Sequence, residues 1–511
     1  MFVWQNFVNK VCKVDTCGFA LAKLSCLSRK RSGMEIAMEN SMEDRNRAAQ
    51  SLPRAFLQRM EKLLGAEYEA FLESYGMERH YGLRRNPLKA DRQSFEERMP
   101  FVLEPVSWAK EGYYYRMEEQ PGRHVLHEAG AYYIQEPSAM AVAEILDPQP
   151  GEMILDLCAA PGGKSTQIAG RMKRKGLLVS NEIIPGRARI LSQNVERMGI
   201  SNCVVCNETP QRMAVFFPAF FDRIVVDAPC SGEGMFRKDD TAVAEWSEDH
   251  VSMCAARQRD ILEEAAKMLK PGGIIVYSTC TFAPDENEEV VSGFLQEHED
   301  FFVEKVSHDA AFTQGRPDWC VHPAGGVEHT LRLMPHRLKG EGHYIARLRK
   351  RGEGMNHVES MEKSRLSGAE RKDRERLQAF LTGELGLAGD WLERRHGVIR
   401  HFGEQIYLVP EGMIPMDGLK VVRPGLHLGT DRKNRIEPAH ALAMALTMEE
   451  TEQAVELTEE EAKRYFNGES LTFEGQKGWT LLGFHGYPLG FGKASGGQMK
   501  NHYPKGLRRQ L

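Results

Sequence analysis

Apolar positions along the chain follow two different periods. From residue 52 to about residue 75 they recur every three or four positions, as at Phe56, Met60, Leu63 and Leu64, which predicts amphipathic helices. From Ile134 to about Leu348, short apolar runs alternate with longer helical patterns. The runs lie at residues 153–157, 177–180, 203–205, 221–226 and 274–277, and helices are expected from 164, at 185–198 and at 250–269. This alternation predicts a parallel, doubly wound α/β sheet, which binds ligands at the carboxyl ends of its strands.

The other parts of the chain differ in pattern from this central region. The chain has 511 residues, more than one hydrophobic core normally supports. We therefore expect several domains, at residues 1–48 (an extension), 49–130 (a small helical module), 131–350 (the α/β domain), 351–376 (a charge-dense linker), 377–450 and 451–511 (two C-terminal domains). The extension has few acidic residues up to Arg31 and resembles no clean signal peptide. We expect it to be disordered or to precede a later start at Met34, Met38 or Met42.

Charge, hydropathy and cysteine content argue against several classes of protein. The net charge is -5, which argues against a protein that coats nucleic acid through bulk charge. Basic residues cluster locally instead, at residues 29–31, 336–339 and 500–509. The sequence contains no run of about 18 apolar residues, so no membrane span is predicted. The ten cysteines indicate reduced thiols in a cytoplasmic protein, and the lone Cys203-x-x-Cys206 indicates a buried strand and no metal site.

An aromatic segment near the end of the N-terminal module has two interpretations. Trp108, Tyr113, Tyr114, Tyr115 and Arg116 interleave rings with positive charge. Such a surface suits single-stranded nucleic acid, whose bases stack on aromatic side chains. A core strand explains the same residues equally well.

The loop after the first predicted strand of the α/β domain is the first chemical motif. It reads Asp156-Leu-Cys-Ala-Ala-Pro-Gly-Gly-Lys-Ser165, between a strand and a helix. Small residues let backbone N–H groups approach a ligand, and a helix N-terminus favours anions. A P-loop needs glycine five residues before Gly163, where Cys158 stands, and the dinucleotide fingerprint is also missing. With Glu182 after the second strand, the loop fits a nucleoside whose ribose bonds to that acid.

Two cysteines follow neighbouring strands of the same predicted sheet. Cys230 lies in Asp227-Ala-Pro-Cys-Ser-Gly-Glu-Gly234, and Cys280 lies in Ser278-Thr-Cys-Thr281. A single cysteine at such a place is more often a small buried apolar residue than a nucleophile. Two of them at the rim that carries the ligand loop indicate nucleophilic chemistry.

These three motifs resemble those of the Nop/Sun family of RNA cytosine-5 methyltransferases. The resemblance covers nearly the whole chain from about Leu52. Within the family the chain is most similar to the bacterial ribosomal RNA branch, because residues 486–490 and 500–508 resemble its terminal PUA-like domain. The resemblance implies a Rossmann-like methyltransferase core, a small helical N-terminal module and C-terminal α+β and PUA-like RNA-binding domains.

The resemblance also implies the cofactor and the site residues. The cofactor is expected to be S-adenosyl-L-methionine. It would be held by Cys158, Ala159, Ala160, Pro161, Gly162, Gly163, Lys164, Glu182, Asn207 and Asp227. Carbon 5 of cytosine is a poor nucleophile, and attack of a thiolate on carbon 6 activates it. Cys280 is expected to attack and Cys230 to release the adduct, with Asp227 on the base edge and Lys164 favouring the thiolate.

Several alternatives stay open at the level of the sequence. The residues alone do not choose between the two cysteines, since DNA cytosine-5 enzymes use a Pro-Cys nucleophile, which would be Cys230 here. The expected partner is RNA, either ribosomal RNA or the small ribosomal subunit, and the target base must leave its stack to be reached. A transfer RNA methyltransferase and a non-catalytic ribosome assembly factor are the competing functions. We expect a monomer.

Overall fold

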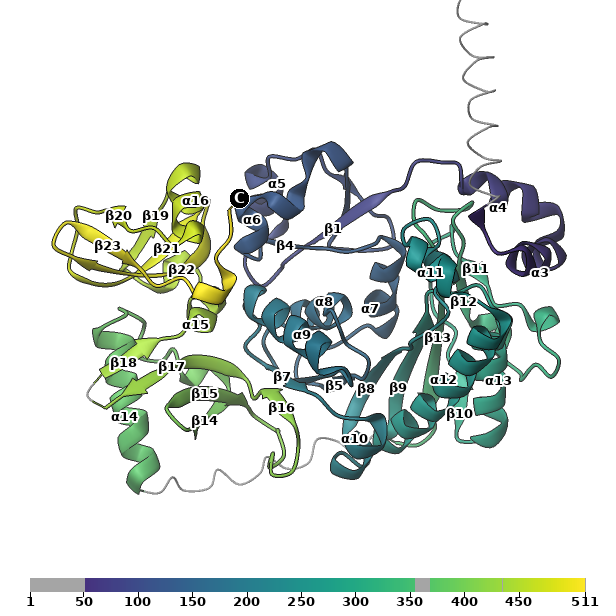
Figure 1. Ribbon diagram of the computed structural model, residues 1–511. Helices are drawn as coiled ribbons and strands as arrows, with labels where there is room; N and C mark the ends of the chain where they lie inside the picture. The colour runs from purple at the N-terminus through teal and green to yellow at the C-terminus, as the bar shows by residue number, and fades with distance from the viewer. Residues whose placement is uncertain (1–50, 354–367, 434, 511) are drawn as a thin grey trace, which may run out of the picture. The chain divides into compact units, whose positions relative to one another are not determined.

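The computed structural model describes residues 51–353, 368–433 and 435–510 (Figure 1). It forms two compact units, one up to Glu78 and one from Arg79. In the first unit, α3 (Arg54–Leu64) and α4 (Tyr68–Ser74) confirm the helical pattern. They bury Phe56, Met60 and Phe71, as the 3.6-residue period predicts. The extension predicted at residues 1–48 lies outside the described residues.

The second unit begins with a sheet where the sequence predicted a helical module. The antiparallel strands, in spatial order, are β2 (Glu104–Pro105), β3 (Gly112–Tyr115), β1 (Tyr81–Arg85) and β4 (Tyr132–Ile134). Only α5 (Arg92–Arg98) and α6 (Val125–Glu128) are α-helical in this stretch. The prediction of a helical module reaching Gly130 is therefore wrong beyond Glu78. Pairing between distant segments decides this sheet, and a local apolar pattern does not record it.

Tyr113 settles part of the question about the aromatic segment. It lies on β3, is 1% exposed, and donates to Glu96 over 2.6 Å. Trp108 is half-buried and donates its indole N–H to the Pro137 carbonyl over 2.8 Å. These two rings therefore belong to the protein interior, as the core-strand interpretation expected.

The centre of the second unit is a ten-stranded sheet. Its parallel part has the order β9-β8-β5-β6-β7. These strands are β5 (Met153–Asp156), β6 (Leu177–Asn181), β7 (Cys203–Cys206), β8 (Phe221–Asp227) and β9 (Leu269–Thr279). Beyond β9 lie antiparallel strands: β10 (Phe301–Val303), β11 (Thr313–Gln314), β12 (Leu331–Leu333) and β13 (His343–Lys350). The predicted doubly wound α/β fold is confirmed.

Helices cover both faces of this sheet (Figure 1). One face carries α7 (Ala141–Leu146), α8 (Gly163–Met172) and α9 (Pro185–Arg197), and the other carries α10 (Pro210–Phe216), α12 (Glu248–Met268) and α13 (Glu288–Glu297). Each face has its own apolar core, one around Ile168 and Leu191, the other around Met213 and Leu262. Cys203 and Cys206 are buried in β7, which confirms the structural interpretation of that pair. The sheet therefore has rigid support for whatever its strand ends carry.

A strand from the C-terminal half closes one edge of the central sheet. β16 (Val421–Arg423) pairs antiparallel with β7. Before it come α14 (Gly368–Gly383), β14 (Gly397–Phe402) and β15 (Gln405–Pro410), and after it β17 (Leu426–Arg432), β18 (Arg435–Pro438) and α15 (His440–Ala445). The predicted linker falls mostly on residues outside the described ones. Its last part, from Gly368, differs from the prediction because it begins α14.

The last segment forms a small five-stranded sheet. The spatial order is β19-β21-β22-β23-β20. The elements are β19 (Ala454–Glu456), α16 (Glu459–Asn467), β20 (Leu471–Thr472), β21 (Gly478–Phe484), β22 (Tyr487–Ser495) and β23 (Gln498–Asn501). Thr458 caps α16 with its hydroxyl, as the Thr-Glu-Glu-Glu start predicts. Within the residues that the structure describes, no helix is long and apolar enough to cross a membrane.

Candidate active site

The loop between β5 and α8 forms one side of the site. The Leu157 and Ala159 N–H groups donate to the Val225 and Asn181 carbonyls of neighbouring strands, over 3.0 and 2.8 Å. Gly162 precedes the helix with a φ of 116°, a conformation that disfavours other residues. The loop is therefore fixed at the carboxyl end of the sheet, with the N-terminus of α8 beside it. This arrangement suits a ligand that accepts hydrogen bonds.

Asp156 at the end of β5 is a site residue that sequence reasoning missed. It is fully buried, and its Oδ2 accepts from the Ser165 hydroxyl over 2.6 Å. Burial raises the pKa of Asp156 to about 7. Its Oδ1 has no hydrogen-bond partner within the described part of the chain. A buried acceptor of this kind fits a donor on a bound ligand, and the signal was available, because Asp156 opens the loop motif.

Glu182 follows β6 and carries a carboxylate that is almost wholly buried. Its Oε1 accepts from the Ile184 N–H over 2.9 Å, and Arg187 lies 3.5 Å from its Oε2. A fixed carboxylate at a strand end can accept from two neighbouring hydroxyls of a ribose. Cys158 in the adjacent loop is half-buried, and desolvation raises the pKa of its thiol. It therefore stays protonated and is unsuited to be a nucleophile.

Asn207 lies just after β7, beside Glu182. Its amide donates to the Glu182 and Ile183 carbonyls, over 2.7 and 2.9 Å. The next residue, Glu208, accepts from the Lys420 N–H and from Arg212, over 3.0 and 2.8 Å. Glu208 is thus engaged in holding the segment before β16. These contacts place Asn207 next to Glu182, the predicted ribose-binding residue.

Lys164 and Asp227 form an ion pair where β5 and β8 end. The Lys164 Nζ lies 2.7 Å from the Asp227 Oδ2, and the Ser278 hydroxyl donates to the Asp227 Oδ1 over 2.8 Å. Burial opposes ionisation of Asp227, but the Lys164 charge and hydrogen bond outweigh it and lower the pKa of Asp227. In turn, burial opposes the charge on Lys164, and Asp227 raises its pKa. Both side chains are therefore ionised at neutral pH.

The two cysteines meet beside this ion pair. The Cys230 Sγ lies 3.3 Å from the Cys280 Sγ. The hydrogen bond with Cys280, followed by burial, raises the pKa of Cys230 well above its usual value. Cys230 is therefore held as a neutral thiol. The structure brings together Cys230, Cys280, Asp227 and Lys164, which the sequence placed at one rim.

His343 was not predicted and lies at the same rim. It begins β13, whose next residue, Tyr344, pairs with Thr279 of β9, so His343 comes level with Cys280. Its Nδ1 lies 3.3 Å from the Ser138 hydroxyl, which itself donates to Glu136. Burial and the nearby Lys164 lower the pKa of His343, which is therefore neutral. A lone histidine in an apolar strand gave no signal, because only the antiparallel pairing brings it here.

The described residues contain no cluster of three or more histidine, cysteine or acidic side chains able to hold a metal ion. The arrangement offers a glycine-rich loop at a helix N-terminus, an ion pair and two close thiols. Thiols are among the side chains that can act as nucleophiles in covalent catalysis.

Four family models match successive parts of the chain. The model of 16S rRNA methyltransferase RsmB/F matches residues 143–349. The N-terminal domain of 16S rRNA methyltransferase RsmF matches residues 52–137, the first C-terminal domain of the RsmF rRNA methyltransferase matches 387–446, and the RsmF PUA domain matches 452–509. The matched ranges follow the order of elements described above.

Relatives and solved structures agree with these models. Ribosomal RNA small subunit methyltransferase F of Vibrio parahaemolyticus is 32% identical over 483 residues, covering 90% of this chain and 98% of the relative. The protein of the same name from Shewanella loihica is 32% identical over 444 residues, covering 84% of this chain and 89% of the relative. A methyltransferase homolog protein from Pyrococcus horikoshii has a TM-score of 0.52 at 28% identity, covering 61% of this chain and 99% of its own. NSun6 from the same organism has a TM-score of 0.51 at 22% identity, covering 59% and 99%, and supports the fold alone.

Proposed function

The chain belongs to the RsmB/F family of 16S rRNA methyltransferases, and from this premise we propose that it methylates carbon 5 of cytosine in ribosomal RNA. S-adenosyl-L-methionine is the proposed methyl donor. The observation that supports this reaction most directly is the meeting of Cys230 and Cys280, 3.3 Å apart, beside the Lys164–Asp227 ion pair. Two thiols at the rim of a nucleoside loop fit a covalent route to a carbon that is itself unreactive.

The residues at the end of β5 and β6 fit this cofactor. Glu182 would accept from the ribose hydroxyls, and the unpartnered Oδ1 of Asp156 would accept from a donor of the ligand. Residues 158–163 would line it with small side chains and backbone, and Asn207 would border the adenine. When bound, S-adenosyl-L-methionine supplies an electrophilic methyl group on a sulfonium centre.

Cys280 is the proposed nucleophile. Its thiolate forms a bond to carbon 6 of the flipped cytosine, and the electron pair of the carbon 5–carbon 6 double bond makes carbon 5 nucleophilic. Lys164 would provide positive charge near the Cys280 thiol, since burial lowers the pKa of its ammonium while Asp227 and Cys280 raise it. The attack is assigned to Cys280, and not to Cys230, on the resemblance of the motifs to those of the RNA cytosine-5 methyltransferases.

Asp227 is proposed to bind the edge of the base. Because the Lys164 charge keeps Asp227 ionised, its carboxylate only accepts hydrogen bonds. The 4-amino group of cytosine is a donor and uracil has an oxygen there, so this contact favours cytosine. Stabilising the negative charge that develops on the ring then falls to the Lys164 ammonium.

Cys230 is proposed to assist release of the product. After methylation, a base takes the proton from carbon 5, the carbon 5–carbon 6 double bond re-forms, and the Cys280 sulfur leaves. The Cys230 thiol, 3.3 Å away, donates to this sulfur as it departs. Without that donor the adduct persists.

The surrounding domains are the proposed RNA grips. The partner would be ribosomal RNA or the small ribosomal subunit, and we propose a monomer that works in the cytoplasm. The domain boundaries predicted from the sequence at residues 48, 130, 350 and 450 are proposed as well. The PUA domain match at residues 452–509 supports an RNA contact there.

Radioactive methyl transfer tests the proposal. Purified protein is incubated with methyl-tritiated S-adenosyl-L-methionine and, separately, small-subunit ribosomal RNA, assembled small subunits and transfer RNA. Bisulfite sequencing compares the same RNAs from a deletion strain. Label in ribosomal RNA and a missing 5-methylcytosine are expected. Label in transfer RNA alone would identify transfer RNA, and not ribosomal RNA, as the substrate. No label together with unchanged bisulfite patterns would favour a non-catalytic role in ribosome assembly.

A further inference from the structure

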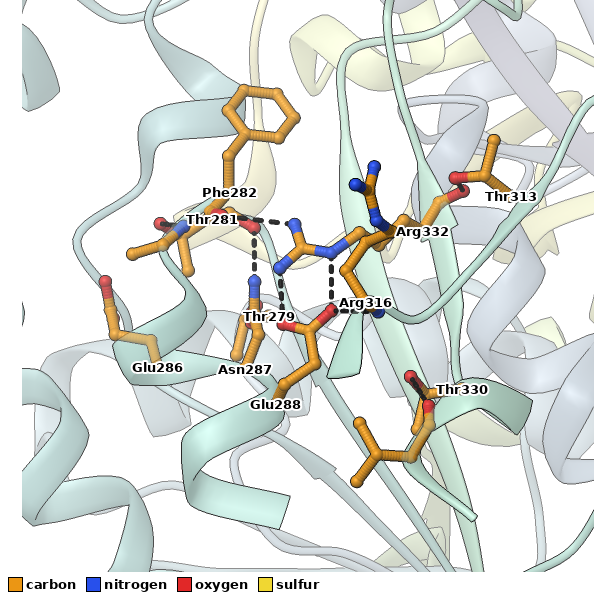
Figure 2. A network of polar contacts seen from close by, with 12 residues as sticks. Thr279, Thr281, Phe282, Glu286, Asn287, Glu288, Thr313, Arg316, Thr330 and Arg332 are labelled. Carbon is orange, nitrogen blue, oxygen red and sulfur yellow. Dashed lines mark hydrogen bonds and ion pairs between the residues drawn. The ribbon is translucent and has the colours of Figure 1, made fainter. Parts of the chain in front are cut away.

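A buried polar network lies behind the two cysteine loops. Figure 2 shows one side of the network, from Thr279 to Glu288, in the segment of the chain that contains Cys280. There Asn287 donates to the Thr281 carbonyl over 3.0 Å and accepts from Thr279 over 2.6 Å. Arg332 bonds to the Glu288 carboxylate and donates to the Phe282 carbonyl over 3.1 Å. These contacts fix the segment that carries Cys280 to α13 and β12.

Glu286 connects that segment to the loop of the other cysteine. It ends a short 3₁₀ turn (Pro284–Glu286) and is fully buried. Its Oε2 accepts from the Ser231 N–H over 2.9 Å and from the Gln258 amide over 2.8 Å, and its Oε1 accepts from the Ser231 hydroxyl. Ser231 comes directly after Cys230. The carboxylate thus holds both the backbone and the side chain of the residue next to one thiol.

The Ser231 hydroxyl extends the connection to the second thiol. Its oxygen lies 2.9 Å from the Thr281 Oγ1, and Thr281 comes directly after Cys280. Because the Ser231 hydroxyl proton goes to Glu286, the Thr281 hydroxyl donates to Ser231. The side chains of Glu286, Ser231 and Thr281 therefore form one hydrogen-bonded chain, which joins the loop of Cys230 to the loop of Cys280.

Stability alone explains Glu286 poorly. Burial, with a further contribution from the neighbouring Glu233 carboxyl, raises the pKa of Glu286 to about 7. Its hydrogen-bond donors are neutral groups of Ser231 and Gln258. A buried carboxyl in such surroundings costs free energy that an apolar side chain would not. A role in the geometry of the cysteines accounts for it better.

We propose that Glu286 is the positioning residue that sets the separation of Cys230 and Cys280 and thereby the release of the RNA adduct. The inference rests on the proposed function, because it gives the two cysteines their separate steps. Glu286 acts through Ser231 and touches neither substrate nor cofactor. Losing it moves Cys230 away from the departing sulfur of Cys280, while Lys164 and Asp227 keep their places for the attack.

Two substitutions separate position from charge. In Glu286→Gln, the amide oxygen can accept from Ser231 N–H and Gln258, while its NH₂ donates to the Ser231 hydroxyl, which then donates to Thr281. Glu286→Gln therefore keeps the hydrogen bonds to Ser231 and Gln258 and removes the charge. Glu286→Ala removes both the hydrogen bonds and the charge. Glu297→Gln, at an exposed carboxylate near the end of the neighbouring α13, is the matched control.

The readout is the amount of protein–RNA adduct that survives denaturing gels with ordinary cytosine RNA. If Cys230 no longer donates to the departing Cys280 sulfur, the loss of that one hydrogen bond costs about 1.4 kcal/mol, which slows release of the adduct ~10-fold. Glu286→Ala is expected to accumulate about 10-fold more adduct than the wild type, with adduct formation within about 3-fold of normal. Glu286→Gln and Glu297→Gln are expected to behave like the wild type. A purely structural residue would lower adduct formation and turnover together and would not raise the adduct.

Further variants keep the outcomes distinct. Ser231→Ala keeps the backbone contact and removes the hydroxyl link, so it should accumulate adduct even where Glu286→Ala does not fold. If Cys230→Ala accumulates adduct and both Glu286→Ala and Ser231→Ala do not, the positioning role is overturned and the proposed function stands. If Cys230→Ala does not accumulate adduct on cytosine RNA, and Cys280→Ala still forms an adduct on 5-fluorocytosine RNA, the proposed function of the two cysteines itself fails.

Discussion

The Sγ atoms of Cys230 and Cys280 lie 3.3 Å apart although 50 residues separate them in the chain. The register of the sheet explains the meeting. β8 and β9 are parallel neighbours in which Asp227 pairs with Ser278. Cys230 follows three residues after Asp227, and Cys280 follows two residues after Ser278. Both loops therefore leave the sheet at the same level.

Replacing Lys164 by Met should disable the attack. Removing one preorganised charge from a reacting centre costs about 10²–10³ in kcat. Without Lys164, the largest contribution that offsets burial of Asp227 is lost and the pKa of Asp227 rises, so the acid limb of the kcat/KM profile moves to higher pH. Methyl transfer measured across pH 5–9 tests this. Lys175→Met, at an exposed lysine after α8, is the control, and an unmoved acid limb in Lys164→Met would contradict the pairing.

Replacing Glu182 by Gln should weaken cofactor binding. The amide has only one acceptor oxygen, and the Ile184 N–H already uses one carboxylate oxygen. Loss of a hydrogen bond to a charged acceptor costs about 1.5–3 kcal/mol, so Kd for S-adenosyl-L-methionine should rise ~10-fold or more. Calorimetric titration without RNA measures it. Unchanged affinity would place the ribose elsewhere.

The buried Arg332–Glu288 pair should be costly to break from one side. Both side chains are at most 2% exposed, and the guanidinium also lies 4.5 Å from the Trp319 ring. Arg332→Met leaves a buried carboxylate unpaired, which costs about 3–5 kcal/mol of the free energy of unfolding. Urea unfolding measures this cost, and Arg332→Met with Glu288→Gln should recover part of it. Lys463→Met, which breaks an exposed pair with Glu459, should cost less than about 1 kcal/mol.

Glu286 should make the free energy of unfolding depend on pH. Its pKa is about 7 in the folded protein and near 4.5 in the unfolded chain. A raised pKa stabilises the fold below about pH 4.5, and this stabilisation is lost as the pH rises to 7. The loss amounts to about 2–3 kcal/mol. Urea unfolding at pH 5 and pH 8 should show a smaller difference in Glu286→Gln than in the wild type, and equal differences would mean that Glu286 does not titrate in this range.

Local patterns predicted the parallel sheet well. The expected strands at 177–180 and 203–205 are β6 (Leu177–Asn181) and β7 (Cys203–Cys206). The helix expected at 250–269 is α12 (Glu248–Met268), which begins two residues earlier than expected and is capped by Ser247. Each of these elements is buried on a sheet face, so its apolar period is strong. The ends of parallel strands share one edge, and this placed the cofactor loop, Glu182, Asp227 and both cysteines together.

The local sequence pattern did not predict contacts between segments that lie far apart in the chain. β16 adds to β7 from more than 200 residues away with a run of three residues. Arg84 looks like a surface residue, yet it is buried and bonds to Gln135 and Thr166. His343 and Glu286 reach the site through antiparallel pairing and a turn. No local period records such contacts, because they depend on which segments meet after folding.

Covalent trapping on 5-fluorocytosine RNA tests the central assignment most directly. Fluorine at carbon 5 cannot leave as a proton, so an attacking cysteine stays bound to carbon 6. Wild type and Cys230→Ala should form an adduct that survives denaturing gels, and Cys280→Ala should form none. Of these three proteins, Cys230→Ala alone should accumulate the adduct on ordinary cytosine RNA. Trapping by Cys280→Ala but not by Cys230→Ala would contradict the account and exchange the roles of the two cysteines.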